Sequence, residues 1–505
     1  MNSYDLDNAL IELTGVSDKK SWTIRQAVEG VQIFGGIGSG KTSGSGRLLA
    51  LKYLSAGFGG LVLSTKPDEK EMWAEYCKIT GRENDLLVVE PGSGHFFNFL
   101  EYESSRAGSS NAITENIVSV LKTVIRASEE KSNGKSDDPF WETALDMLIF
   151  NVIDLCKLAY GSLSVKRMFE IVQSIPKPES NEEQSTSVNA FRDAFDNARE
   201  NVVNRIEAWK GKQTVETLTD IEDENSFNEI ITREIPEARL LKFLDQFFME
   251  TYYNLSEKTR SIIDFSFTGF LFRLLRDPVN DLFCQNVSTF TPEDSIKGKI
   301  ILINLPVKVY DKIGRDCQVM FKYIWQRAME KRSIREDARP VFLWADEAQN
   351  FLHEHDAEYQ ATARSSRIAT VYISQNLPNY YANMGGAKAE YRVKSFLGTL
   401  ATKIFHANAD IETNRYASDL IGDDFYEEMS KTSTAAGQFS ASRTKSLKLD
   451  RLVRPEEFMS LKTGGPANDF RVEGYLHCQG NSLSRNHIKM AFNQNYKPIS
   501  KLIEA

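Results

Sequence analysis

A glycine-rich octapeptide near the start of the chain, GGIGSGKT at residues 35–42, restricts the possible folds more sharply than any other stretch. It matches the pattern GxxxxGK[ST], whose glycines let consecutive backbone N–H groups curl around phosphate oxygens without Cβ clashes. The apolar run 31–34 precedes the octapeptide, and a segment of helical periodicity, 48–57, follows it. The pattern therefore predicts a phosphate-binding loop between a strand and a helix, with the helix starting near Gly40 and directing its positive end at the phosphates.

The octapeptide also indicates which residues bind the nucleotide. We expect Lys41 to reach the β- and γ-phosphates of ATP, and the Thr42 hydroxyl to ligate Mg²⁺. The other nucleotide-binding residues that the pattern predicts are Gly35, Gly36, Ile37, Gly38, Ser39, Gly40 and Ser43. A glycine-rich structural turn is the alternative, which the position directly after a strand and before a helix disfavours.

Phosphoryl transfer also requires carboxylates, and the segment VFLWADEAQN at 341–350 supplies two at the end of an apolar strand. Asp346, at the carboxyl end of the strand, is predicted to hold Mg²⁺ through water, and Glu347 to act as the general base that orients the attacking water. The alternative is a strand that ends in two solvated acids.

Three further polar residues are candidates for the same reaction. The apolar run 369–374 is followed by Gln375, whose amide we expect to lie between the phosphate loop and the acidic strand and to sense the γ-phosphate. Arg364 is predicted to stabilise phosphate charge across a subunit boundary, with Arg367 as the weaker candidate. Either arginine could instead be a surface salt-bridge partner.

The segment HEHD at 353–356 suggests a metal site, but the two histidines of an HxH pair point apart on a helix. We therefore expect His353 and His355 to be solvated or to cap a helix.

The order of predicted elements favours an α/β protein with an inserted helical domain. Strand-like runs occur on both sides of a long helical region, as in a parallel sheet built from βαβ units; they cover residues 31–34, 60–63, 87–89, 298–304, 341–345 and 369–374. Helical periodicities occupy the region between them, at 111–126, 141–159 and 260–277. We predict a nucleotide-binding domain from 1–106 and 292–505, and an all-α domain at 107–291. The Ser/Thr-rich segment 430–446 is predicted to be a mobile loop.

Length and composition bound the remaining classes of protein. A chain of 505 residues exceeds the size of one hydrophobic core, so at least two domains are expected. Charged residues interrupt the most apolar stretch, 141–159, which therefore predicts a buried helix rather than a membrane span. The five cysteines form no CxxC pair, which excludes a disulfide framework and disfavours structural zinc. Without a secretion signal at its start, the protein is expected in the cytoplasm.

The formal net charge of −9 is unevenly distributed. Residues 181–250 carry sixteen Asp/Glu against eight Lys/Arg, whereas residues 361–404 carry six Lys/Arg against one Glu. The second region could hold DNA, with Tyr372, Tyr380, Tyr381 and Tyr391 stacking on bases. The alternative is ordinary solvated charge and tyrosines that pack in the core.

The order of these motifs resembles the TraG/TraD-type coupling ATPases of type IV secretion, within the HerA–FtsK group of RecA-like DNA translocases. The resemblance covers about residues 25–480 and rests on GGIGSGKT, STKPDE, HFFNFLEY, DPFWETALDML, LSEKTRSIIDFSFTGFLFRLLRDPV, GKIILINLP, LWADEAQNF, ARSSRIATVYISQN and NADIETNRYASDLIG.

The resemblance implies a RecA-like P-loop NTPase domain with a parallel central sheet and an inserted all-α domain. It implies that Lys41 and Thr42 form the Walker A pair, that Asp346 and Glu347 form the Walker B pair, that Gln375 is the sensor and that Arg364 acts in trans. It further implies a hexameric ring that threads DNA at the expense of ATP. The helical domain would contact relaxase or other cargo, and secretion-channel components would be partners. The acidic stretch 181–250 fits such protein docking better than DNA binding.

Two departures from the family pattern bear on these expectations. Members of the coupling branch usually carry N-terminal membrane helices, and residues 1–34 hold no predicted span. The protein is therefore expected to reach the inner face of the membrane through a partner, or to be a cytosolic translocase of another process. In STKPDE, Ser64 and Thr65 stand where the branch often has Asp before the lysine, so Lys66 and Glu69 are expected only as neighbours of the nucleotide.

Two other functions remain open from the sequence. The same ATPase could energise protein export, with the acidic region gripping a basic polypeptide. The chain could also be a nucleotide-gated scaffold, for instance in antiviral defence, in which ATP controls assembly alone.

Overall fold

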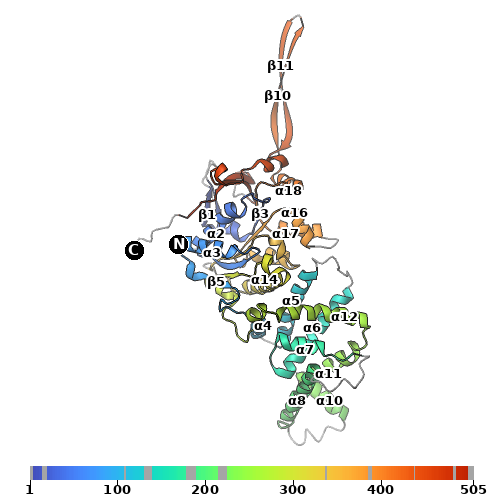
Figure 1. Ribbon diagram of the computed structural model, residues 1–505. Helices are drawn as coiled ribbons and strands as arrows, with labels where there is room; N and C mark the ends of the chain where they lie inside the picture. The colour runs from blue at the N-terminus through green and yellow to red at the C-terminus, as the bar shows by residue number, and fades with distance from the viewer. Residues whose placement is uncertain are drawn as a thin grey trace. The chain divides into compact units, whose positions relative to one another are not determined.

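The computed structural model describes residues 4–13, 20–106, 110–129, 139–177, 189–213, 224–335, 338–384, 389–436, 438–480 and 485–498 (Figure 1). Two units make up the chain. Unit 1 comprises Met1–Val88 and Pro292–Ala505, and unit 2 comprises Val89–Thr291. The helical region is thus inserted between two parts of one α/β unit.

A mixed sheet forms the centre of unit 1, with the strand order β13-β12-β9-β3-β8-β7-β4-β6-β5 among the described residues. Neighbouring strands from β9 to β6 run parallel, whereas β12 and β13 are antiparallel to their neighbours. The strands are β3 (Val31–Phe34), β4 (Gly59–Leu63), β5 (Leu86–Val89), β6 (Ile300–Ile303), β7 (Val341–Ala345), β8 (Ile368–Ser374), β9 (Thr402–Phe405), β12 (Arg471–Cys478) and β13 (His487–Asn493). The expected α/β class with a parallel central sheet is confirmed.

Helices cover this sheet, so its central strands are buried along their whole length and are mostly apolar, as parallel strands require. Trp73 of α3 stacks on Phe342 of β7 at 5.6 Å and meets Trp344 edge-on at 5.4 Å. The helices of unit 1 are α1 (Ile24–Val28), α2 (Arg47–Ser55), α3 (Glu69–Ile79), α14 (Val307–Glu330), α15 (Asp356–Ala363), α16 (Leu377–Met384), α17 (Ala389–Gly398) and α18 (Ile411–Ile421). A short pair, β1 (Ala9–Leu13) and β2 (Lys20–Thr23), lies outside the main sheet.

Beyond Val89, the last residue of β5, the regular secondary structure in the described residues of unit 2 is helical. Its helices are α4 (Phe99–Arg106), α5 (Ser110–Glu129), α6 (Pro139–Tyr160), α7 (Val165–Gln173), α8 (Ala190–Lys210), α10 (Glu224–Glu234), α11 (Pro236–Gln246), α12 (Glu257–Leu274) and α13 (Val279–Phe283). The periodicities expected at 111–126 and 141–159 lie inside α5 and α6, and that at 260–277 covers most of α12. The all-α insertion is therefore confirmed as part of the fold class.

The two units divide at 88/89 and 291/292, whereas the predicted first boundary lies at 106/107. The aromatic run before α4 explains the difference. Phe97 packs on Phe290 with ring centroids 5.7 Å apart and on Tyr102 at 5.2 Å, so residues 89–106 contribute to the helical unit.

The expectation of a mobile loop at 430–446 is wrong. Two long strands, β10 (Asp423–Ala436) and β11 (Gln438–Arg451), form an antiparallel hairpin there (Figure 1). Among the described strands they pair with each other alone, so no buried face imposes apolar alternation on their sequence. Backbone hydrogen bonds between the two strands, rather than burial of one face, hold this hairpin together.

Among the described residues, no single helix is both long enough and apolar enough to cross a membrane. The pair Thr143–Tyr160 and Val165–Gln173 meets these criteria together but is bent by 113°.

Candidate functional site

The strand order brings the predicted site residues to one edge of the sheet. β8 lies between β3 and β7, all three parallel, so the residues that follow them meet at their common carboxyl edge. Gly35 begins the phosphate loop after β3, Gln375 follows β8, and Asp346 follows β7. The Gly35 N–H donates to the Ser374 carbonyl at 3.3 Å, which joins the loop to β8.

The phosphate loop has the open backbone that its glycines allow. Gly38 and Gly40 have φ of +70° and +79°, in the left-handed region that favours glycine. Right-handed helical dihedrals begin at Lys41, and the helical turn Thr42–Gly46 leads into α2. The Ser39 hydroxyl is buried and has no hydrogen-bond partner among the described residues. The loop therefore holds an unsatisfied polar group where a phosphate oxygen is expected.

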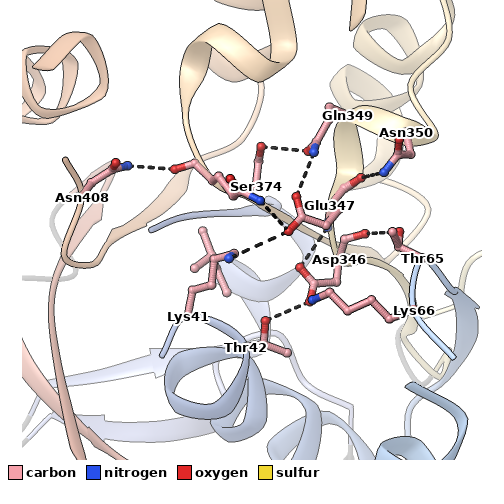
Figure 2. A network of polar contacts seen from close by, with 12 residues as sticks. Lys41, Thr42, Thr65, Lys66, Asp346, Glu347, Gln349, Asn350, Ser374 and Asn408 are labelled. Atoms are coloured by element: carbon pink, nitrogen blue, oxygen red, sulfur yellow. Dashed lines mark hydrogen bonds and ion pairs between the residues drawn. The ribbon is translucent and has the colours of Figure 1, made fainter. Parts of the chain in front are cut away.

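Asp346 is buried and lies against polar groups from two other segments, the phosphate loop and the residues that follow β4 (Figure 2). Its Oδ2 accepts a hydrogen bond from the Thr42 hydroxyl at 2.9 Å and lies 3.6 Å from Lys66 Nζ. The Thr65 hydroxyl donates to its carbonyl at 3.1 Å. Burial opposes the charge on Lys66, but Asp346 and the neighbouring carboxylates, Glu69 first among them, raise the pKa of its ammonium above the ordinary value. Lys66 thus stays charged beside the predicted metal ligand.

Glu347 adopts a left-handed backbone conformation, with φ of 50° and ψ of 50°. Non-glycine residues hold this conformation at some cost, which is often met at functional sites. Gln349 Nε2 donates to Glu347 Oε2 at 2.8 Å (Figure 2). Gln375 Nε2 donates to Glu347 Oε1 at 3.1 Å. Lys41 Nζ lies 4.0 Å from the same Oε1. Two amides therefore orient the carboxylate toward the phosphate loop.

The residues present fit a magnesium ion. Thr42 and Asp346 place a hydroxyl and a carboxylate oxygen within hydrogen-bonding distance, and oxygen ligands are the kind that Mg²⁺ prefers. Among the described residues, no group of three or more His, Cys, Asp or Glu forms a metal cage. Mg²⁺ normally needs no such cage, because it is held by one or two protein oxygens together with substrate phosphates and water.

Several residues that shape the site were not among the predicted site residues. Gln349 orients Glu347, and the Asn408 amide donates to the Gln375 carbonyl at 2.8 Å.

His406, which was also not predicted, is buried behind the phosphate loop. Its Nδ1 bonds the Glu473 carbonyl at 2.8 Å, so Nδ1 carries the proton and Nε2 accepts from the Ser45 hydroxyl at 2.7 Å. In the sequence, the signal for these positions is the group of polar residues that follows each strand.

The Glu69 carboxylate, expected only as a neighbour, accepts from the backbone N–H of Thr65 at 3.3 Å and of Lys66 at 3.2 Å. Burial, followed by the charge of Asp346, raises its pKa well above the usual range. Glu69 thereby shapes the turn that presents Thr65 and Lys66 to Asp346.

A pocket of about 430 Å³ adjoins the phosphate loop within unit 1. Gly36, Ile37 and Ser39 form one wall. The other walls comprise Gln375, Asn376, Ala407, Asn408, Ala409, Asp410, Met459 and Thr463.

The two candidate arginines lie at the opposite edge of the sheet from Lys41. Both precede β8, whose length of about 20 Å separates them from Gln375. Arg364 is exposed and lies 3.2 Å from a Glu29 oxygen. The Arg367 guanidinium is buried and donates to the carbonyls of Tyr4 and Ala338. Neither arginine reaches the phosphate loop of its own chain.

Part of the proposed DNA-binding set is wrong. Tyr372 and Tyr380 are buried, with Tyr380 donating to Gln32 Oε1 at 2.8 Å, so neither ring can stack on a base. Lys403 is also buried, and burial lowers its pKa to about 8. Tyr391 is exposed. Tyr381 is half-buried, and Lys388 lies outside the described residues.

The expectation that His353 is solvated or capping is also wrong. Its ring is buried, with Nε2 3.0 Å from Gln326 Oε1, and burial lowers its pKa to about 3. His355 stands at the N-cap position of α15, without a side-chain capping bond.

Comparison with known proteins finds solved structures of the same fold and a family model that matches one segment of the chain. Residues 340–463 match the family model described as the TraM recognition site of TraD and TraG. The bacterial conjugative coupling protein TrwBdeltaN70, in its unbound form, is 13% identical with a TM-score of 0.60, over 96% of this chain and 89% of that chain. No curated protein sequence matches the chain.

Two further TrwB structures are similar. The complex with the GTP analogue GDPNP is 13% identical with a TM-score of 0.59, over 96% of this chain and 90% of the other. The complex with ADP and Mg²⁺ is 12% identical with a TM-score of 0.56, over 95% and 88%. At these identities the likeness establishes the fold alone. The chain therefore has the fold of the conjugative coupling protein TrwB and a TraD/TraG segment at 340–463, which confirms the predicted resemblance to TraG/TraD-type coupling ATPases.

Proposed function

We propose that the chain hydrolyses ATP at the carboxyl edge of β3, β8 and β7, and uses the energy to move DNA as the coupling ATPase of a conjugative or type IV secretion system. The observation that carries the proposal is the convergence of a phosphate loop on two acids that lie about 300 residues further along the chain. Thr42 bonds Asp346 at 2.9 Å, and Lys41 lies 4.0 Å from Glu347.

The proposed roles follow from this arrangement. Lys41 and the N–H groups of the phosphate loop hold the β- and γ-phosphates. Thr42 and Asp346 hold Mg²⁺, which when bound neutralises charge on the phosphates. Glu347 accepts the proton of the attacking water, and Gln375 holds the Glu347 carboxylate while sensing the γ-phosphate. The solved TrwB complexes with ADP and Mg²⁺ and with GDPNP support nucleotide binding on this fold.

The proposed assembly is a ring, expected to be a hexamer, in which Arg364 reaches the site of a neighbouring subunit. Its exposure and its distance from its own phosphate loop support action in trans. The nucleotide-binding domain would comprise residues 1–88 with 292–505, and the helical domain, 89–291, would contact relaxase or other cargo. The match of 340–463 to a TraM recognition site supports a further protein partner there. Secretion-channel components would hold the protein at the inner face of the membrane.

ATP turnover by the purified full-length chain, with and without single- and double-stranded DNA, tests the proposal. We expect hydrolysis that requires Mg²⁺, rises with DNA and disappears in Glu347→Gln. Turnover indifferent to DNA would favour a protein exporter, and the absence of turnover with retained nucleotide binding would favour a nucleotide-gated scaffold. Electron micrographs with ATP and DNA test the ring.

A further inference from the structure

Helix α14 carries a buried stripe of polar side chains. Gln318, Lys322 and Gln326 are spaced four residues apart, so they lie on one face of the helix. Their exposed fractions are 0%, 0% and 2%. A charged lysine is almost never buried to this degree unless it is paired, because burial without partners is costly. The stripe therefore has a specific set of partners.

Those partners lie in the segments that follow the strands β4, β6 and β7. Gln318 Nε2 donates to the carbonyls of Ser64 at 2.9 Å and Leu305 at 2.8 Å, and its Oε1 accepts from the Ser64 N–H at 2.6 Å. Lys322 Nζ donates to the Phe351 carbonyl at 2.9 Å and to Asp356 at 2.6 Å.

Asp356 is the common acceptor at the end of the turn 348–356, which follows Glu347. It accepts from Lys322, from Gln326 Nε2 at 2.9 Å, from the His353 N–H at 2.8 Å and from the Tyr372 hydroxyl at 3.3 Å. Burial opposes its charge, but His353, Lys322 and the hydrogen bonds together lower its pKa to about 2. The carboxylate is therefore ionised at neutral pH and fully satisfied.

At its other end, the same turn begins directly after Glu347, which carries the proposed catalytic carboxylate. Tyr372 and Ser374 alternate along β8 and so face the same side of the sheet. The Ser374 hydroxyl donates to Gln349 Oε1 at 2.9 Å, and Gln349 in turn donates to Glu347 (Figure 2). The turn is thus fastened to β8 at Gln349 and at Asp356, and to α14 through Lys322.

We propose that the Lys322–Asp356 pair is a positioning device that keeps the turn 348–356 in place and thereby aims the Glu347 carboxylate at the attacking water. The proposal rests on the proposed hydrolysis. Glu347 has an unfavourable left-handed backbone, which persists only where the surroundings impose it. Thr42 and Lys41 are attached to the phosphate loop and do not depend on the turn. Loosening the turn should therefore slow turnover without weakening nucleotide binding.

The double variant Lys322→Met/Asp356→Asn tests this inference. It removes both charges while keeping similar side-chain size, a change that buried ion pairs often tolerate in stability. We expect kcat for ATP to fall about 10- to 100-fold, because displacement of a catalytic group by about 1 Å costs that much. KM and the affinity for a fluorescent ATP analogue should stay within about threefold of wild type. A folded double variant with wild-type kcat overturns the inference.

Trp325→Phe is the matched control. Trp325 lies on the same helix, is buried and donates to the Ser295 hydroxyl at 3.0 Å, away from the turn. Its loss should leave kcat within about twofold of wild type. An equal loss of kcat in the control would mean general loosening of α14 and would overturn the positioning role.

Two further measurements test the inference if the double variant does not fold or if the wild-type chain does not hydrolyse ATP. If the double variant does not fold, Tyr372→Phe removes one bond to Asp356. A severalfold lower kcat at unchanged KM then supports the inference, and unchanged kcat overturns it.

If the wild-type chain does not hydrolyse ATP, the proposed function fails by itself. Backbone hydrogen exchange of residues 347–351 then decides: faster exchange in the double variant than in Trp325→Phe supports positioning, and equal rates overturn it.

Discussion

The Thr42 hydroxyl donates a hydrogen bond of 2.9 Å to the carboxylate of Asp346, a residue 304 positions further along the chain. One residue comes from the end of the phosphate loop and the other from the end of β7, with β8 between their strands. The sheet therefore assembles an oxygen pair suited to Mg²⁺ from distant parts of the sequence.

The first prediction concerns this pair. Thr42→Val keeps the shape of the side chain but removes its oxygen, so the Mg²⁺ concentration for half-maximal ATP binding should rise at least about tenfold. Thr42→Ser keeps the oxygen and should bind as wild type does. Titration of nucleotide binding with Mg²⁺ measures both variants, and equal Mg²⁺ dependence would remove Thr42 from the proposed metal site.

The second prediction concerns Glu347. Glu347→Gln keeps one oxygen that can accept from Gln349 or Gln375 but cannot take a proton, so kcat should fall about 10²- to 10⁴-fold. The affinity for ATP should persist, because Lys41 and Thr42 are unchanged. Steady-state turnover beside equilibrium nucleotide binding makes the measurement. A variant that turns over ATP normally would show that another group accepts the proton.

The strands and the phosphate loop were predictable because their signals are local. The run 31–34 and the glycines after it specify β3 and its loop without reference to distant residues. The apolar segment before Asp346 likewise predicts β7.

Features that depend on distant partners were not predictable. His353 looks like a polar loop residue until Gln326, 27 positions earlier, is brought against its ring. Tyr372 looks available for stacking until its strand is placed in the middle of the sheet, where Asp356, the first residue of α15, accepts a hydrogen bond from its hydroxyl. The hairpin β10–β11 has a backbone ladder whose polar sequence carries no periodic signal.

The third prediction is a pH dependence of stability that arises from His406. Burial, and to a lesser extent the charge of Lys41, lower its pKa from 6.5 to about 4 in the folded chain, against the opposing bond to Glu473. Between these values the unfolded chain binds more protons than the folded chain, so stability is complete above pH 6.5 and falls as the pH drops toward 4. From pH 7.5 to 5.0 this residue should cost about 2 kcal/mol of unfolding free energy.

Chemical denaturation of wild type and His406→Gln at both pH values measures this effect. The loss in the variant should be smaller by about 2 kcal/mol. His353 and His477 also have lowered pKa values and contribute equally to both proteins, so the difference isolates His406. Equal pH slopes would mean that His406 is accessible to protons in the folded chain.

The last prediction compares two glycines of the phosphate loop. Both have positive φ, but a Cβ on Gly38 would meet no atom within 4 Å, whereas one on Gly40 would lie 2.5 Å from Val472 Cγ2 and 3.0 Å from the Thr463 carbonyl oxygen. Gly38→Ala should therefore cost about 1–2 kcal/mol, the price of the left-handed backbone alone. Gly40→Ala should cost clearly more, because β12 must also move.

A double-mutant cycle separates the clash from the backbone strain. Val472→Ala alone removes buried methyl groups and destabilises the chain, but combined with Gly40→Ala it makes room for the new Cβ. The double variant should therefore be less destabilised than the sum of the single variants, whereas Gly38→Ala and Val472→Ala should be additive. Denaturant midpoints measure each corner of the cycle. Additivity of Gly40→Ala with Val472→Ala would show that β12 does not press on the phosphate loop at this position.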